Sequence, residues 1–166
     1  MATRMYRARS KSSLAPGVSL QEIQLVREVS CLPTPVTSAM DLAQLLRPHM
    51  QRLHRETFVV VPLNAKHAPL GMHLVSIGTA SSSLVHPREV FLPAIVCGAS
   101  AIVVAHNHPS GHPEPSQEDH DVTDRLREGG RLLGIPLLDH LVMGATEFFT
   151  FAGEATLPFT NQKEEQ

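Results

Sequence analysis

The stretch AIVVAHNHPSGHPEPSQED, residues 101–119, holds both a structural and a chemical pattern. Its first five residues are apolar and rich in β-branched side chains, which is typical of a buried strand. A loop rich in proline and glycine follows. Ser116 is placed to begin the longest helix, which we expect to run to about Leu133 and to stop at Gly134. Polar side chains therefore lie where a buried strand passes into a loop and a helix.

The sequence on either side of this stretch predicts a mixed α/β domain built on one sheet. Ser38 is expected to cap a helix that continues through Met50, with Pro48 able to shorten or kink it. The apolar run 58–61 predicts a second buried strand, and residues 73–79 predict its antiparallel partner. The remaining expected elements are a helix over 88–97 that follows Pro87, and two last strands over 137–143 and 148–151.

We expect the folded domain to cover residues 38–156. Residues 1–17 carry four basic side chains and no acidic one, and they predict a disordered basic tail. Residues 18–37 predict a short helix, begun by the capping box of Ser19 and Glu22, and then a proline-rich linker. Residues 157–166 are expected to form a disordered C-terminal tail.

Composition excludes several classes of protein. A chain of 166 residues fits one domain, and its net charge of −2 lacks the basic surface of a dedicated nucleic-acid binder. No apolar run reaches the roughly 18 residues that a membrane-spanning helix needs, so we expect no membrane partner. Two cysteines cannot form a disulfide framework or a four-cysteine zinc site. Because no secretory signal is evident, we expect a cytoplasmic protein.

A metal site is the first chemical interpretation of residues 101–119. His106 and His108 are two residues apart, so both rings lie on one side of an extended chain. Asp119 lies in the first turn of the next helix, and the loop brings its carboxylate back to the end of the strand. Two nitrogens and one oxygen leave a fourth tetrahedral position open, which is typical of a catalytic zinc ion. We therefore predict one Zn²⁺ per chain, where it would lower the pKa of a bound water and polarise a carbonyl.

Each part of this pattern also has a simpler interpretation. Ten histidines in a chain of this length give about 0.6 H-x-H pairs by chance, so the pair alone is weak evidence. Ser116 and Asp119 form S-x-x-D, which is also a helix cap. The two interpretations are compatible, because Ser116 can cap the helix while Asp119 faces a metal.

The motif H-x-H, seven residues and S-x-x-D resembles the JAMM metalloprotease motif of the JAB/MPN domain. Residues from about 50 to 153 resemble the RadC family more closely, in the stretches RETFVVVPLN, GTASSSLVHPREVF, AHNHPSGHPEPSQED and LLGIPLLDHLVMG. The resemblance implies a cytidine-deaminase-like α/β fold, a mixed sheet flanked by helices. It also implies hydrolysis of a peptide or isopeptide bond in a protein or peptide substrate.

The resemblance assigns a role to each residue of the motif. It implies that His106, His108 and Asp119 bind zinc and that Ser116 donates a hydrogen bond to the developing oxyanion. Asn107 stands where many JAMM enzymes have serine or threonine, although RadC-like proteins commonly carry asparagine.

The family pattern also requires an upstream glutamate as general base. Glu56 is the first candidate, because it opens the first predicted strand in the context R-E-x-F; its alternative is an exposed acid at a strand end. Glu89 is the second candidate, although an acid at the start of a helix is also favourable to the helix dipole.

Other functions remain in competition with the hydrolase. One is a DNA-repair-associated or mobile-element accessory protein in which zinc is mainly structural; the net charge predicts that any DNA binding is weak and depends on the basic tail. A zinc deaminase is rejected because the chain has no C-x-x-C. Asp139 and His140 are expected to form a satisfied buried pair or to contact the ligands, not to bind metal themselves. The sequence carries no signal for a particular oligomeric state.

Overall fold

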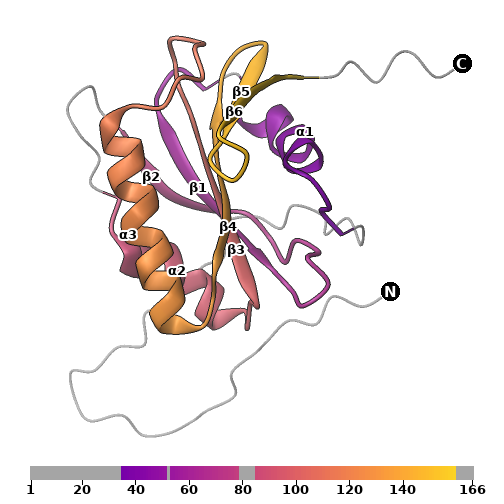
Figure 1. The fold of residues 1–166 in the computed structure, drawn as a ribbon, viewed down its shortest axis with the longest axis vertical. Helices are drawn as coiled ribbons and strands as arrows, with labels where there is room; N and C mark the ends of the chain where they lie inside the picture. The colour runs from indigo at the N-terminus through magenta and orange to yellow at the C-terminus, as the bar shows by residue number, and fades with distance from the viewer. Residues whose placement is uncertain (1–34, 52, 79–84, 160–166) are drawn as a thin grey trace, which may run out of the picture.

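A six-stranded mixed sheet forms the middle layer of the structure, a computed structural model that describes residues 35–51, 53–78 and 85–159. The elements in chain order are α1 (Ala39–Met50), β1 (Thr57–Leu63), β2 (His73–Ile77), α2 (Pro87–Val96), β3 (Ala101–Asn107), α3 (Gln117–Leu133), β4 (Leu137–Met143), β5 (Glu147–Thr150) and β6 (Ala155–Pro158). The order across the sheet is β2-β1-β3-β4-β5-β6, and β3 and β4 are its parallel pair. Helix α1 covers one face and helices α2 and α3 cover the other (Figure 1). The expected fold, a mixed sheet flanked by helices, is confirmed.

The inner strands β1 and β3 carry long apolar runs, residues 58–63 and 101–105, because helices cover both of their faces. Every residue of each strand is buried. Along β1, Val59 and Val61 pack in the core under α1, whereas Phe58 and Val60 pack in the core under α2 and α3. Alternate side chains of a strand point to opposite faces, so two separate cores require an unbroken apolar run. The strands predicted from these runs are confirmed.

Local signals set the limits of the helices. Ser38 caps α1 by accepting a hydrogen bond from the main-chain nitrogen of Asp41, and the helix passes through Pro48 without ending there. Ser116 caps α3 in the same way, with Asp119 as its partner. Gly134 ends α3 in the left-handed conformation, with φ of 68°, which glycine adopts without steric cost. Helix α3 therefore begins at a defined residue, with Asp119 in its first turn.

The C-terminal boundary of the domain lies beyond the expected residue 156. Strand β6 runs to Pro158, and Phe159 is buried against Phe148, with the guanidinium of Arg47 4.3 Å from the Phe159 ring centre. The expected tail over 157–166 is therefore wrong for 157–159, since these residues belong to the sheet and the core. The predicted basic tail and short N-terminal helix lie outside the described residues, as do residues 160–166. Among the helices that are described, none has the length and apolar character to cross a membrane.

Candidate metal centre

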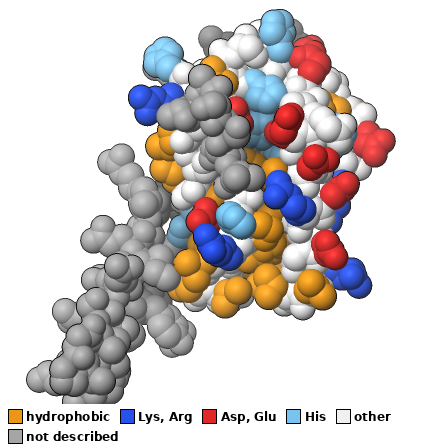
Figure 2. All heavy atoms as spheres, turned by 90° about the vertical axis from the view of Figure 1, so that its left-hand side faces the viewer, with side chains coloured by type: hydrophobic (Ala, Val, Ile, Leu, Met, Phe, Trp, Pro, Cys, Tyr) orange, Lys and Arg blue, Asp and Glu red, His pale blue; other side chains and the backbone are white. Residues whose placement is uncertain are grey.

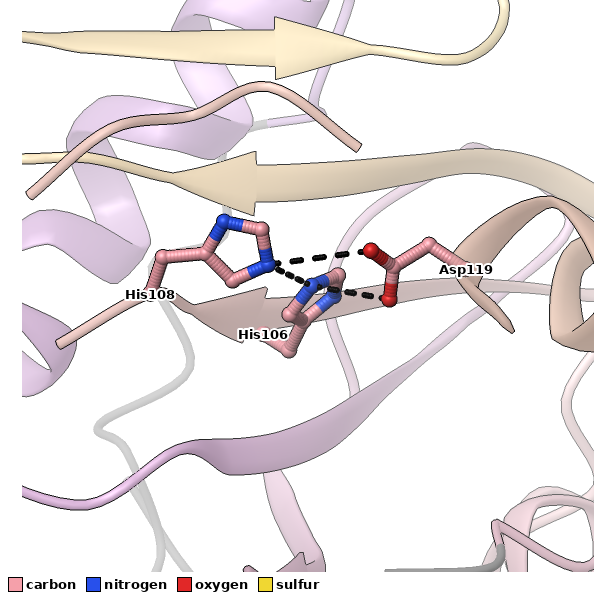
Figure 3. Close-up of side chains that lie close together, drawn as sticks. All are labelled: His106, His108 and Asp119. Atoms are coloured by element: carbon pink, nitrogen blue, oxygen red, sulfur yellow. Dashed lines mark hydrogen bonds and ion pairs between the residues drawn. The ribbon is translucent and has the colours of Figure 1, made fainter. Parts of the chain in front are cut away.

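His106, His108 and Asp119 come together where β3 ends and α3 begins (Figure 3). Their possible ligand atoms all lie within 4.8 Å of one another. The Nε2 atom of His106 is 3.0 Å from Nε2 of His108 and 3.1 Å from Oδ1 of Asp119. The Nε2 atom of His108 is 3.7 Å from Oδ2 of Asp119. Ligand atoms about 2.0–2.1 Å from a tetrahedral zinc ion lie roughly 3.3 Å from each other. The three residue-to-residue distances are close to this spacing, so the three side chains could hold such an ion.

The tautomer of His108 is fixed by the loop that follows it. Its Nδ1 atom is 2.9 Å from the main-chain oxygen of His112. A carbonyl oxygen can only accept, so the hydrogen is on Nδ1 and, in the neutral ring, Nε2 keeps its lone pair. That lone pair points to the space between His106 and Asp119. His112 therefore acts through its main chain, as part of the loop.

Asp119 supplies the negative charge of the site. Burial alone would raise the pKa of its carboxyl, but hydrogen bonds from His106 and His108 outweigh burial and hold that pKa well below the ordinary value. In return, the hydrogen bond to Asp119 raises the pKa of His108 despite the burial of the ring. Oxygen Oδ2 also accepts hydrogen bonds from the main-chain nitrogen and the hydroxyl of Ser116, both at 2.7 Å. A carboxylate anion beside two imidazoles is a set of atoms that attracts a cation.

The inner side of the site is sealed by aromatic and polar contacts. His106 is fully buried, and its ring stacks on Phe58 with 5.9 Å between the ring centres. Its Nδ1 atom is 2.8 Å from Nε2 of His140, which is fully buried on β4. The carboxylate of Asp139 accepts hydrogen bonds from the main-chain nitrogens of His140 and Ala152. Asp139 is only half-buried and its carboxylate contacts main-chain nitrogens, so the two residues do not form the expected buried pair. The alternative expectation, a contact with a predicted metal ligand, describes His140, which contacts His106.

A family model for the RadC-like JAB domain matches residues 36–156. The chain belongs to this family. It is similar to a UPF0758 protein of Rubrobacter xylanophilus, with 47% identity over 135 residues, 79% of this chain and 60% of the relative. A UPF0758 protein of Moorella thermoacetica is 48% identical over 141 residues, 85% of this chain and 59% of the relative. A third, of Methanosarcina mazei, is 41% identical over 119 residues, 72% of this chain and 52% of the relative. The chain thus spans between half and three fifths of the length of these relatives.

In this RadC-like JAB domain, Glu56 lies directly before β1 and its side chain is exposed. Its carboxylate is close enough to the site to be one of the charges that raise the pKa of His108, after the larger effect of the hydrogen bond that His108 donates to Asp119. The main-chain oxygen of Glu56 accepts a hydrogen bond of 2.7 Å from the nitrogen of Gly78, which directly follows β2. The hydrogen bonding between β1 and β2 therefore continues to Glu56. The expected position of Glu56 at the start of the first strand is correct to one residue.

Asn107 connects the segment that carries Glu56 to β3, and the sequence interpretation missed this role. Its side chain is 3% exposed and makes three hydrogen bonds. Oxygen Oδ1 accepts from the main-chain nitrogen of Thr57 at 2.9 Å. Nitrogen Nδ2 donates to the main-chain oxygens of Leu53 and Arg55, each at 3.2 Å. The residue between the two histidines therefore holds the chain on both sides of Glu56.

Glu89, the second candidate base, lies in the first turn of α2. Its side chain is exposed and is 3.9 Å from the guanidinium of Arg88. On the face of the RadC-like domain that carries α3, histidine side chains lie beside acidic ones (Figure 2). The described contacts of Glu89 thus fit an acid at a helix start, whereas Glu56 is linked to β3 beside the ligands.

Proposed function

We propose that the protein is a zinc-dependent hydrolase that cleaves a peptide or isopeptide bond in a protein or peptide substrate. The observation that carries the proposal is the convergence of His106, His108 and Asp119 on one point. The side chains of His108 and Asp119 are 19% and 13% exposed, while His106 is fully buried. The site is therefore sealed from within and accessible from outside, as a catalytic metal centre requires.

The roles of the individual residues follow from their positions. When bound, a zinc ion would polarise the scissile carbonyl and lower the pKa of a water to near 7. Glu56 would accept a proton from the attacking water and deliver it to the leaving amine. The hydroxyl of Ser116 donates to Oδ2 of Asp119. To stabilise the oxyanion, this hydroxyl would turn from Asp119 to the substrate as negative charge develops there. Ser116 therefore serves first as a cap and as support for a ligand.

The competing proposal is a DNA-associated accessory protein with a structural zinc ion. A structural site is normally closed by four protein ligands, whereas the described residues supply three. On the α3 face, basic and acidic side chains are intermixed (Figure 2), which gives little attraction for a phosphate backbone. Both observations favour the hydrolase.

The test combines metal analysis with a screen for amide-bond cleavage, using peptides and isopeptide-linked model substrates. We expect about one zinc ion per chain in the wild type. Glu56→Gln keeps the shape of the side chain but cannot accept a proton, so cleavage should fall about 10²–10⁴-fold with unchanged zinc content. Glu89→Gln is the matched control and should cleave at the wild-type rate. If Glu89→Gln loses activity and Glu56→Gln does not, the base is Glu89; if neither change lowers cleavage, the hydrolase proposal fails.

A further inference from the structure

Three buried side chains form a hydrogen-bonded chain that leads inward from His106. Nδ1 of His106 is 2.8 Å from Nε2 of His140, and Nδ1 of His140 is 2.6 Å from Oγ1 of Thr123. The exposed fraction is 0% for both histidines and 1% for Thr123. The three residues come from β3, β4 and α3, so the chain joins elements that are distant in the sequence. None of the contacts described above explains why a hydroxyl is buried at this position.

The direction of each hydrogen bond can be worked out from the far end of this chain. Oγ1 of Thr123 is 2.6 Å from the main-chain oxygen of Asp119, which can only accept. The hydroxyl has one hydrogen and donates it there, so Nδ1 of His140 must donate to Oγ1. Burial favours the neutral ring of His140, which carries one N–H only, so its Nε2 must accept. His106 therefore donates from Nδ1.

We propose that Thr123 sets the tautomer of His106 through His140, and that this hydroxyl is thereby a determinant of metal affinity. With a hydrogen on Nδ1, His106 presents Nε2 to His108 and Asp119, and a metal bound there would replace any hydrogen that this atom donates to Asp119. The inference rests on the metal site of the proposed function and assigns to it a positioning residue that touches no ligand side chain. The same hydroxyl also fixes the position of the Asp119 main chain relative to His140, and through His140 relative to His106. Residues that hold the second ring nitrogen of a ligating histidine commonly tune metal affinity in this way.

Thr123→Val is the direct perturbation, because it replaces the hydroxyl with a methyl group of similar volume. Nδ1–H of His140 then has no acceptor, and the tautomer with the hydrogen on Nε2 becomes competitive. That tautomer requires Nδ1 of His106 to accept, which moves the hydrogen of His106 to Nε2, where the metal would bind. We expect the zinc affinity to fall about 10–100-fold. Thr123→Ser keeps the hydroxyl and should restore an affinity close to that of the wild type.

Thr150→Val is the matched control. The hydroxyl of Thr150 is also buried, 3% exposed, and donates to Oδ2 of Asp139 at 2.6 Å, but it has no described contact with His106 or His140. This variant should lose stability in metal-free urea unfolding and keep the wild-type zinc affinity. A general loss of packing would instead lower the affinity of both valine variants.

The experiment measures the zinc dissociation constant by competition with a chromophoric chelator, for the wild type and the three variants. Nitrogen-15 NMR of the histidine rings in the metal-free proteins reports the tautomers directly, and in the wild type it should find the hydrogen of His140 on Nδ1. An unchanged zinc affinity in Thr123→Val, an equal loss in Thr150→Val, or a wild-type His140 with its hydrogen on Nε2 would each overturn the proposal. If the wild type binds no zinc, the proposed function fails, while the NMR result still decides whether the tautomer chain exists.

Discussion

Replacing Asn107 by alanine should loosen the segment that carries Glu56 and leave the three proposed metal ligands in place. The side chain of Asn107 makes three hydrogen bonds to the main chain of residues 53–57. None of these bonds involves His106, His108 or Asp119. Zinc content should therefore stay at the wild-type level, and the effects should appear in the stability of the fold and in the position of the proposed base.

The structure gives the size of the stability loss. The bond from the nitrogen of Thr57 to Oδ1 of Asn107 is buried, and a buried amide without a partner costs about 1–3 kcal/mol. The other two bonds end on carbonyl oxygens of the exposed residues Leu53 and Arg55, so water can replace much of what is lost. We therefore expect the free energy of unfolding to fall by about 2–4 kcal/mol in total. A base displaced by about 1 Å would also lower amide cleavage about 100-fold, mainly in kcat.

Urea unfolding and amide hydrogen exchange measure these effects without a known substrate. The main-chain amide of Thr57 should exchange faster in Asn107→Ala than in the wild type. Asn64→Ala is the matched control: Oδ1 of Asn64 accepts from the main-chain nitrogens of Lys66 and Ala68, in the turn after β1. It should lower stability without changing the exchange of Thr57. A Thr57 amide that stays as protected in Asn107→Ala as in the wild type would refute the reasoning.

Four further predictions concern the ligands, the cap, pH and DNA. His108→Ala should lose most of the zinc, measured by metal analysis, because two remaining ligands rarely hold it; full zinc content would contradict the site. Ser116→Ala should lower the free energy of urea unfolding by about 1 kcal/mol, through loss of the α3 cap, and keep its zinc. Burial lowers the pKa of His73, so below about pH 6.5 the unfolded chain takes up a proton that the folded protein does not. The free energy of unfolding should therefore fall as the pH falls. Between about pH 7.5 and 5.5, this fall should be smaller in His73→Gln. Deleting residues 1–17 should abolish a weak, salt-sensitive binding of DNA in fluorescence anisotropy, and tight binding by the shortened protein would favour the accessory role.

The central strands and the helix limits could be predicted because their signals are local. A strand covered on both faces needs a long apolar run, and residues 58–63 of β1 and 101–105 of β3 form such runs. Strand β6 gives no such signal, since it has four residues, lies at the edge of the sheet and buries none of them fully. Phe159 was the available signal, because an aromatic side chain directly after an expected domain end is often part of the core. The C-terminal boundary was therefore placed too early.

The grouping of His106, His108 and Asp119 could be predicted because one strand, one loop and one helix start bring these residues together. The residues that support them could not, because each depends on a partner in a distant element. His140 is on β4 and meets Thr123 of α3, and both positions resemble ordinary core positions in the sequence. Asn107 is part of the motif itself, yet its three partners lie about 50 residues earlier, two before β1 and one at its first residue.

The position of Glu56 depends on the pairing of β1 with β3. Phe58 lies opposite His106 at the end of this antiparallel ladder, so Glu56 and His108 each lie two residues beyond the last pair. A shift by one residue would turn Glu56 to the other face of the sheet, because side chains alternate along a strand. The register is held by the alternation of β1 between two cores and, at its end, by the bond from Thr57 to Asn107. A single asparagine between two proposed ligands thus connects the proposed base to the proposed metal site. For this reason Asn107→Ala should lower amide cleavage without lowering zinc content, whereas a change in either histidine should lower both.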